Sequence, residues 1–245
     1  MNLVKTIGAV GVLFAFAAAP AHAQTVRLGT EGAYPPYNFI NDAGEIDGFE
    51  RVLGDELCSR AELDCTWVKN DWDSIIPNLV SGNYDAIIAG MSITDERDEV
   101  IDFTQAYIPP DPSAFAGLDG TELEIGADTV IAAQTNTIQA SWVAASGATL
   151  VEFATPDETI AAVRNGEADA VLADSKYLEP IVAESGGELA FVHEPVMIGG
   201  GVGMGLRETD GELKARLDAA ITSMKEDGTL NALLTEWFGE EAVLW

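Results

Sequence analysis

Short apolar runs alternate with segments of helical period along most of the chain. In the first series, strand-like runs alternate with helix-like segments in the order 26–29, 48–60, 66–68, 73–80 and 84–90. A second series repeats that order with 129–133, 137–145, 150–153, 157–165 and 169–173. Alternating strands and helices are typical of parallel α/β architecture. The pattern therefore predicts two similar α/β units.

The last helix, turn and strand of each unit can be laid on each other. Six positions recur 84 residues later: Ile76, Leu79, Gly82, Asp85, Ala86 and Ala89 match Ile160, Val163, Gly166, Asp169, Ala170 and Ala173. Duplication of one unit would explain this match, and independent convergence of two units on the same βαβ arrangement would explain it equally well. Ligands of open α/β sheets lie beyond the carboxyl ends of the strands, which here are residues 90–92 and 174–175. Two facing lobes would bring both ends to one cleft.

Two segments suit crossovers between such lobes. Residues 108–113 contain three prolines, which do not fit a sheet interior, and residues 197–203 are rich in glycine. The glycine run lacks the Lys-Ser/Thr ending of a phosphate-binding loop. We therefore predict that the C-terminal strand and helices return to the first lobe, which then comprises 24–110 and 200–245. The second lobe comprises 111–199, and two connecting strands let the lobes hinge.

The N-terminus has the layout of a cleaved secretory signal. Lys5 precedes an apolar run over 7–19, and the small-residue triplet 21–23 follows. A retained membrane anchor is the alternative, but the run is shorter than the roughly 20 residues that a spanning helix needs. We predict a signal peptide over 1–23, cut before Gln24, and a periplasmic protein that is not embedded in the membrane.

Charge and cysteine content exclude several classes of function. The chain has 12 basic and 41 acidic residues, a formal net charge of −29, which argues against nucleic acid or anionic lipid as partner. Beyond the predicted cut, His193 is the single histidine, so we expect no metal and no cofactor. The two cysteines, Cys58 and Cys65, are close enough in sequence to form one local disulfide in an oxidising compartment.

Arg97 is the most informative candidate for ligand binding. It follows the apolar run 84–90 and lies in the first turn of a helix opened by residues 94–96. The residues three and four positions away on that helix are not acidic, so the usual ion pair within a helix is unavailable. A guanidinium matches the planar carboxylate of a ligand. An ion pair with Asp102 or with another distant acid is the structural alternative.

Asp174 and two aromatic residues extend this candidate site. Asp174 ends the corresponding strand of the second unit, where it could accept hydrogen bonds from an ammonium group or cap the following helix; both interpretations stay open. Tyr34 and Trp72 lie in strand-to-helix connections, where binding residues concentrate. Each of them could instead be a core residue.

Several segments together resemble the periplasmic amino-acid-binding proteins of polar amino-acid ABC transporters, the family 3 extracellular solute-binding proteins. The resemblance covers nearly all of the chain beyond the predicted signal, and the segments that carry it are 29–37, 48–50, the two cysteines, 76–79, 89–97, 102–103 and 225–229. It implies the two-lobe, type II periplasmic binding protein fold.

The resemblance also implies roles for individual residues. Arg97 binds the ligand carboxylate, whereas Ser92, the main chain at Gly90 and Asp174 meet the α-ammonium. Tyr34 and Trp72 sandwich the ligand side chain, and main chain near Thr137 contacts the carboxylate. The full predicted set is Glu31, Tyr34, Trp72, Gly90, Met91, Ser92, Arg97, Thr137, Ile138 and Asp174. Two positions depart from the family pattern, because Asn136 replaces a glycine and Glu50 replaces an aspartate.

We therefore expect a monomeric binding protein that delivers an amino acid to an ABC transporter permease and is not an enzyme. Glu31 mildly favours a cationic or polar amino acid, and Asp111 could also reach the cleft. One alternative is an enzyme of the same fold that resembles the cyclohexadienyl dehydratases acting on arogenate or prephenate, which would need an acid of raised pKa. Another is a sensory protein that presents its bound form to a chemoreceptor.

Overall fold

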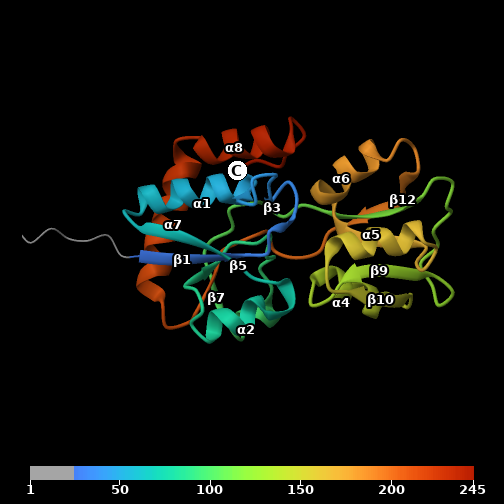
Figure 1. Cartoon of the computed structure of the whole chain (residues 1–245), viewed down its shortest axis with the longest axis horizontal. Coiled ribbons are helices and arrows are strands. Elements are labelled where there is room, and N and C mark those ends of the chain that lie inside the picture. Colours follow the sequence, from blue (N-terminus) through green and yellow to red (C-terminus); the bar gives the residue numbers. More distant parts are fainter. Residues whose placement is uncertain (1–24) are drawn as a thin grey trace, which may run out of the picture.

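The structure is a computed structural model that describes residues 25–245, and it consists of two α/β lobes side by side (Figure 1). The predicted signal peptide and its cleavage site lie outside the described residues. Between residues 25 and 245, no helix has both the length and the apolar character needed to cross a membrane. The two α/β units predicted from the alternating pattern are confirmed.

The first lobe is built on a sheet of order β5-β1-β6-β13-β7. Its strands are β1 (Thr25–Thr30), β5 (Asp64–Lys69), β6 (Ala86–Ile87), β7 (Asp102–Phe103) and β13 (Gly205–Leu206). Strand β1 pairs in parallel with β5 and β6, whereas β13 is antiparallel to β6 and β7. The lobe's longer helices are α1 (Phe49–Arg60), α2 (Ile75–Val80), α7 (Gly211–Glu226) and α8 (Thr229–Phe238). Helices α1, α7 and α8 pack together, and α2 lies across the sheet from α1 (Figure 1).

The second lobe is built on a sheet of order β10-β9-β11-β8-β12. Its strands are β8 (Ser113–Leu118), β9 (Val130–Gln134), β10 (Thr149–Phe153), β11 (Ala170–Asp174) and β12 (Leu189–Val196). Strand β9 is parallel to β10 and β11, as the pattern predicts, but β8 is antiparallel to β11 and β12. The helices are α4 (Ile138–Ser146), α5 (Pro156–Arg164) and α6 (Ser175–Glu184).

Two chain segments connect the lobes and lie side by side. One leads from β7 to β8 and the other from β12 to β13, and they form an antiparallel bridge between Ile108 and Val202. A Cβ atom at Gly201, whose φ is +91°, would lie 2.7 Å from the Ile108 carbonyl oxygen. Glycine is therefore required where the two segments approach each other. The predicted lobe boundaries at 110/111 and 199/200 fall within these segments and stay a prediction.

Short elements near the carboxyl ends of the strands carry several candidate site residues. A small sheet of order β2-β3-β4 comprises Ala33–Tyr34, Asn38–Ile40 and Ile46–Asp47. A 3-10 helix, η1 (Trp72–Ser74), begins with Trp72, and α3 (Asp95–Asp98) contains Arg97. The helix predicted around Arg97 is thus present, and Thr94 caps it by accepting a hydrogen bond from the Arg97 N–H at 3.2 Å.

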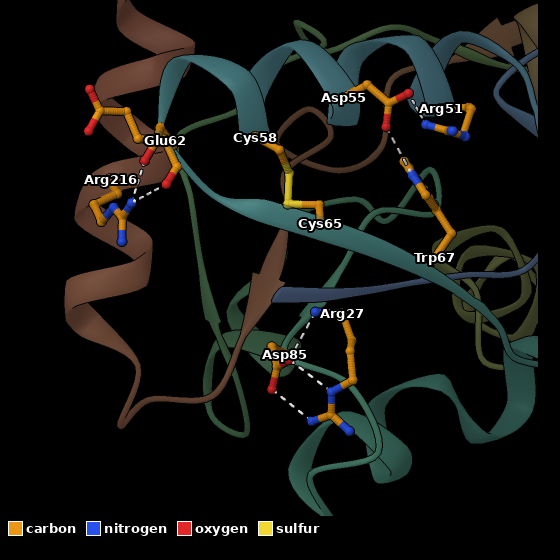
Figure 2. The surroundings of a disulfide bond; sticks show 10 residues. Arg27, Arg51, Asp55, Cys58, Glu62, Cys65, Trp67, Asp85 and Arg216 are labelled. Carbon is orange, nitrogen blue, oxygen red and sulfur yellow. Dashed lines mark hydrogen bonds and ion pairs between the residues drawn. A yellow bond between two sulfur atoms is a disulfide. The ribbon is translucent and has the colours of Figure 1, made fainter. Parts of the chain in front are cut away.

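A disulfide between Cys58 and Cys65 joins α1 to β5 (Figure 2), as predicted. Polar contacts lie around it: the Trp67 indole donates to Asp55 at 3.1 Å, and Arg27 forms an ion pair with Asp85 at 2.8 Å. The disulfide therefore links α1 covalently to β5, the edge strand of the first sheet.

Replacing both cysteines by alanine is expected to lower the free energy of unfolding by about 2 kcal/mol, because the closed loop restricts the unfolded chain. Urea unfolding of the variant and of the oxidised and reduced wild-type protein measures the effect. Ligand affinity should not change, since neither cysteine lines the pocket between the lobes. Identical urea midpoints for the variant and the oxidised wild type would contradict this expectation.

Candidate functional site

A pocket lies between the two lobes. The first lobe lines it with Glu31, Tyr34, Trp72, Ala89, Gly90, Ser92 and Arg97, and the second with Gln134, Thr137, Ile138, Gln139 and Asp174. Nine of the ten predicted site residues therefore come together. Met91 does not line this pocket: it is fully buried in the hydrophobic core and borders an adjacent groove. That these residues bind a ligand stays a prediction.

Arg97 brings a positive charge to the pocket and also contacts the second lobe. Its guanidinium donates to the Ser92 carbonyl at 2.8 Å and to the Asn136 carbonyl, across the cleft, at 3.0 Å. It also lies over the Trp72 ring, 5.4 Å from the centroid. Desolvation lowers the pKa of Arg97 to about 10, so the side chain is cationic at neutral pH. Within the described residues Arg97 forms no ion pair with Asp102 or another acid, because its hydrogen bonds go to carbonyl groups, and Asp102 lies 4.0 Å from Lys214; the alternative of an ion pair is wrong.

The N-terminus of α4 adds hydrogen-bond donors on the other side of the cleft. Thr137 caps this helix by accepting a hydrogen bond from Ala140 N–H at 3.1 Å, and its hydroxyl donates to the Gln134 carbonyl at 2.7 Å. The first N–H groups of a helix have no partner within it and favour an anion. Asn136 adopts a φ of +57°, a left-handed conformation that asparagine tolerates better than most residues. Together with Arg97, this helix end can hold a carboxylate.

Asp174 supplies a carboxylate from the end of β11. It accepts hydrogen bonds from the Tyr34 hydroxyl at 2.8 Å and from the Gln139 amide at 3.1 Å. Its side chain makes no capping hydrogen bond to α6, so the helix-cap interpretation is wrong. Burial raises the pKa of Asp174 to about 6, against the opposing effect of these hydrogen bonds and of Arg97. At neutral pH the group is ionised and can accept hydrogen bonds from an ammonium.

The two predicted aromatic walls have different surroundings. The Tyr34 ring stacks on Tyr177 of the second lobe, with centroids 4.3 Å apart and planes 13° from parallel, so one of its faces is covered by protein. Trp72 is 8% exposed and belongs to the core of the first lobe, yet it also lines the pocket. Trp72 can therefore be a core residue of the first lobe and contribute to the pocket wall at the same time.

Glu31 is a second carboxyl group in the pocket and is only 5% exposed. Its carboxyl accepts a hydrogen bond from the Gln134 amide across the cleft at 2.7 Å. Burial raises the pKa of Glu31 to about 7, although the Gln134 hydrogen bond and the charge of Lys69 lower it. A cation placed beside Glu31 would favour its ionised form.

Sequence reasoning missed Ala89, Gln134 and Gln139, and it left Asp111 open. Gln134 ends β9 and Gln139 lies in the first turn of α4. Their place next to a strand end was the signal that could have found them. Asp111 lines a separate pocket with Tyr37 and Phe238. Within the described residues, no group of three His, Cys, Asp or Glu side chains is placed to hold a metal ion.

Known proteins resemble this chain over nearly its whole length. Residues 26–240 match the bacterial extracellular solute-binding proteins, family 3. The lysine/arginine/ornithine-binding periplasmic protein of Escherichia coli K12 is 30% identical, covering 94% of this chain and 93% of the relative. A crystal structure of a periplasmic His/Glu/Gln/Arg/opine family-binding protein from Silicibacter pomeroyi in complex with lysine is 74% identical. It covers 90% of this chain and 100% of the other, with a TM-score of 0.87.

One similar structure bears on the dehydratase alternative. The ancestral amino acid-binding protein AncCDT-1, a precursor of cyclohexadienyl dehydratase, is 26% identical and has a TM-score of 0.76, covering 87% of this chain and 95% of the other. It is a more distant relative than the lysine complex, and it is itself an amino-acid-binding protein.

Proposed function

Since the chain belongs to the bacterial extracellular solute-binding proteins of family 3, we propose that it captures a cationic amino acid, lysine above all, in the pocket between its lobes. The family and the similar proteins are amino-acid-binding proteins, not enzymes. The solved relative at 74% identity was crystallised with lysine. The dehydratase activity is therefore not proposed.

The charges of the pocket carry this proposal. One cationic side chain, Arg97, and two carboxyl groups, Glu31 and Asp174, line it. Lysine has the complementary set, with one carboxylate and two ammonium groups. We assign the carboxylate to Arg97 and the N-terminus of α4, the α-ammonium to Asp174, and the distal ammonium to Glu31. Closely spaced charges of complementary sign fix the orientation of a ligand and exclude others.

Delivery to a transporter and export are further parts of the proposal. The lysine/arginine/ornithine-binding and histidine-binding relatives are periplasmic proteins, and the predicted signal over 1–23 provides the route to the periplasm. We propose that the closed, ligand-bound protein is recognised by an ABC transporter permease. The permease would recognise closure from the relative position of the two lobes, since both lobes line the pocket.

A thermal-shift screen of ligand-stripped protein lacking residues 1–23 tests the amino-acid assignment. A ligand that binds only the folded state stabilises it, by about 2.7 kcal/mol at a hundred times Kd, which corresponds to roughly 5 to 10 °C for a chain of this size. We expect lysine and arginine to give shifts of this order and alanine and glutamate to give much smaller ones. If no common amino acid raises the melting temperature, the proposed function is wrong.

A further inference from the structure

Glu50 is a buried acid that the proposed ligand contacts do not use. It lies in the first turn of α1 and is 0% exposed. Its carboxylate accepts hydrogen bonds from the Asn38 amide at 2.7 Å, from the Gly90 N–H at 2.6 Å and from the Tyr107 hydroxyl. These donors come from β3, from the pocket wall and from the connection between the lobes. One side chain thus joins three parts of the first lobe.

All three contacts suit an ionised carboxylate, which only accepts hydrogen bonds. None of the donors carries a charge, so the Glu50 carboxyl group has no direct cationic partner among these contacts. Burial raises the pKa of Glu50, and the hydrogen bonds from Tyr107, Gly90 and Asn38 lower it. A buried charge held only by neutral donors is costly and acts strongly on nearby charges, because the protein interior screens poorly.

The contact with Gly90 reaches the wall of the pocket. A peptide unit is planar and trans, so its N–H and C=O groups point in opposite directions. By holding the Gly90 N–H, Glu50 fixes the plane of the Ala89–Gly90 peptide and points the Ala89 carbonyl away from itself. Both residues line the pocket. Gly90 has a φ of +60°, a conformation that strains residues with a Cβ atom, so the hydrogen bond helps to hold an unusual backbone turn.

The contact with Tyr107 anchors Glu50 on its far side. Tyr107 is fully buried, its N–H donates to the Val202 carbonyl at 2.8 Å, and its carbonyl accepts from the Trp245 indole at 3.0 Å. Tyr107 is therefore fixed within the crossing segments. Glu50 is held between this anchor and the pocket wall.

We propose that Glu50 is a positioning residue for the α-ammonium of the ligand: it fixes the Ala89–Gly90 peptide in the pocket wall and places a buried negative charge behind it. The inference rests on the proposed function. The ammonium then contacts Asp174 of the second lobe and the Ala89–Gly90 peptide of the first lobe. Glu50 lies behind this peptide and fixes its orientation. The carboxylate side of the ligand does not depend on Glu50, because Arg97 and α4 hold it.

Glu50→Gln tests the proposal, because glutamine keeps the size but loses the charge and replaces one acceptor oxygen by a donor. The probes are L-lysine and 6-aminohexanoate, which is lysine without its α-ammonium. Isothermal titration should show that Glu50→Gln weakens lysine binding at least about tenfold, or about 1.4 kcal/mol, and changes 6-aminohexanoate binding less than twofold. The preference of the wild type for lysine over 6-aminohexanoate should therefore fall about tenfold.

Glu158→Gln is the matched control, since Glu158 also accepts a main-chain hydrogen bond, from the Thr155 N–H at 3.0 Å, but does not line the pocket. It should lower stability to urea and leave the preference between the two probes unchanged. Equal weakening of both probes in Glu50→Gln, or no weakening of either, overturns the proposal in favour of a purely structural role.

A measurement on the wild type remains decisive if Glu50→Gln does not fold. The amide resonance of Gly90 should shift more when lysine binds than when 6-aminohexanoate is bound at saturation. An unchanged Gly90 resonance in the lysine complex overturns the proposal. Lysine binding with an unchanged resonance leaves the proposed function intact, whereas no lysine binding at all overturns the function itself.

Discussion

Arg97→Ala is expected to weaken lysine binding roughly 30- to 5,000-fold, or about 2–5 kcal/mol, the usual cost of removing one partner of a desolvated charge pair. The loss arises because the ligand carboxylate keeps the helix α4 N–H groups but loses the guanidinium. Isothermal titration at pH 8, where the carboxyl groups of the pocket are ionised, measures it.

Two further variants make the Arg97 result specific. Arg97→Lys should bind with intermediate affinity, because lysine keeps the charge but cannot form the planar two-pronged contact. Arg164→Ala is the matched control: Arg164 forms a surface ion pair with Glu188 at 3.0 Å and does not line the pocket. Its affinity should equal that of the wild type. An affinity of Arg97→Ala within threefold of the wild type would refute the assignment of the carboxylate site.

Glu31→Gln is expected to weaken lysine binding roughly ten- to hundredfold at pH 8, because a charge-assisted hydrogen bond to the distal ammonium is lost. The Gln134 amide that contacts Glu31 can still donate to the new amide oxygen, so the pocket itself should persist. A neutral ligand of similar length, glutamine, should bind the variant no worse than it binds the wild type. Unchanged lysine affinity would remove Glu31 from the site.

The raised pKa of Glu31 adds a pH dependence to the same prediction. Below about pH 7 the buried carboxyl holds a proton, which must leave before the group can pair with a cation. Lysine affinity of the wild type should therefore fall as the pH falls, by at most roughly 30-fold between pH 8 and 5.5 from Glu31 alone. In Glu31→Gln a smaller decrease should remain, roughly fourfold, because the pKa of Asp174 is also raised, to about 6.

The stability of the ligand-free protein should depend on pH in the opposite direction. Folded Glu31 keeps its proton up to about pH 7, whereas in the unfolded chain it loses it near 4.5. The folded state therefore binds more protons between these values, and the free energy of unfolding falls as the pH rises from about 4.5 to about 7. Urea unfolding at pH 5 and pH 8 should show a smaller difference for Glu31→Gln than for the wild type.

The parallel part of each sheet and the place of the pocket could be predicted from sequence because both follow from local pattern. Apolar runs gave β1, β9 and β11, and the strand-end rule brought Arg97 and Asp174 to one cleft. Strands β8 and β12 were not predicted. The proline-rich segment before β8 indicated only a connection between lobes, and antiparallel pairing between strands far apart in sequence leaves no local signal.

Contacts between distant residues also decided the interpretations that sequence left open. Whether Asp174 caps a helix or faces the pocket depends on the Tyr34 hydroxyl, which lies 140 positions away in the chain. The role of Glu50 likewise depends on Tyr107, 57 positions away. Residue type and spacing cannot show such pairings. Residue type and spacing do show that these polar groups lie near strand ends or in the first turn of a helix, where hydrogen bonds to distant residues can form.

The discontinuous first lobe has a consequence for how the protein matures. All strands of the second sheet lie in one uninterrupted stretch, from Ser113 to Val196, whereas the first sheet needs β13 to fill the gap between β6 and β7. A chain that is synthesised from its N-terminus can therefore complete the second lobe before the first lobe. Until the last 41 residues, 205–245, arrive, the half-built first lobe exposes unpaired strand edges, and this interval is when the protein most needs protection from aggregation.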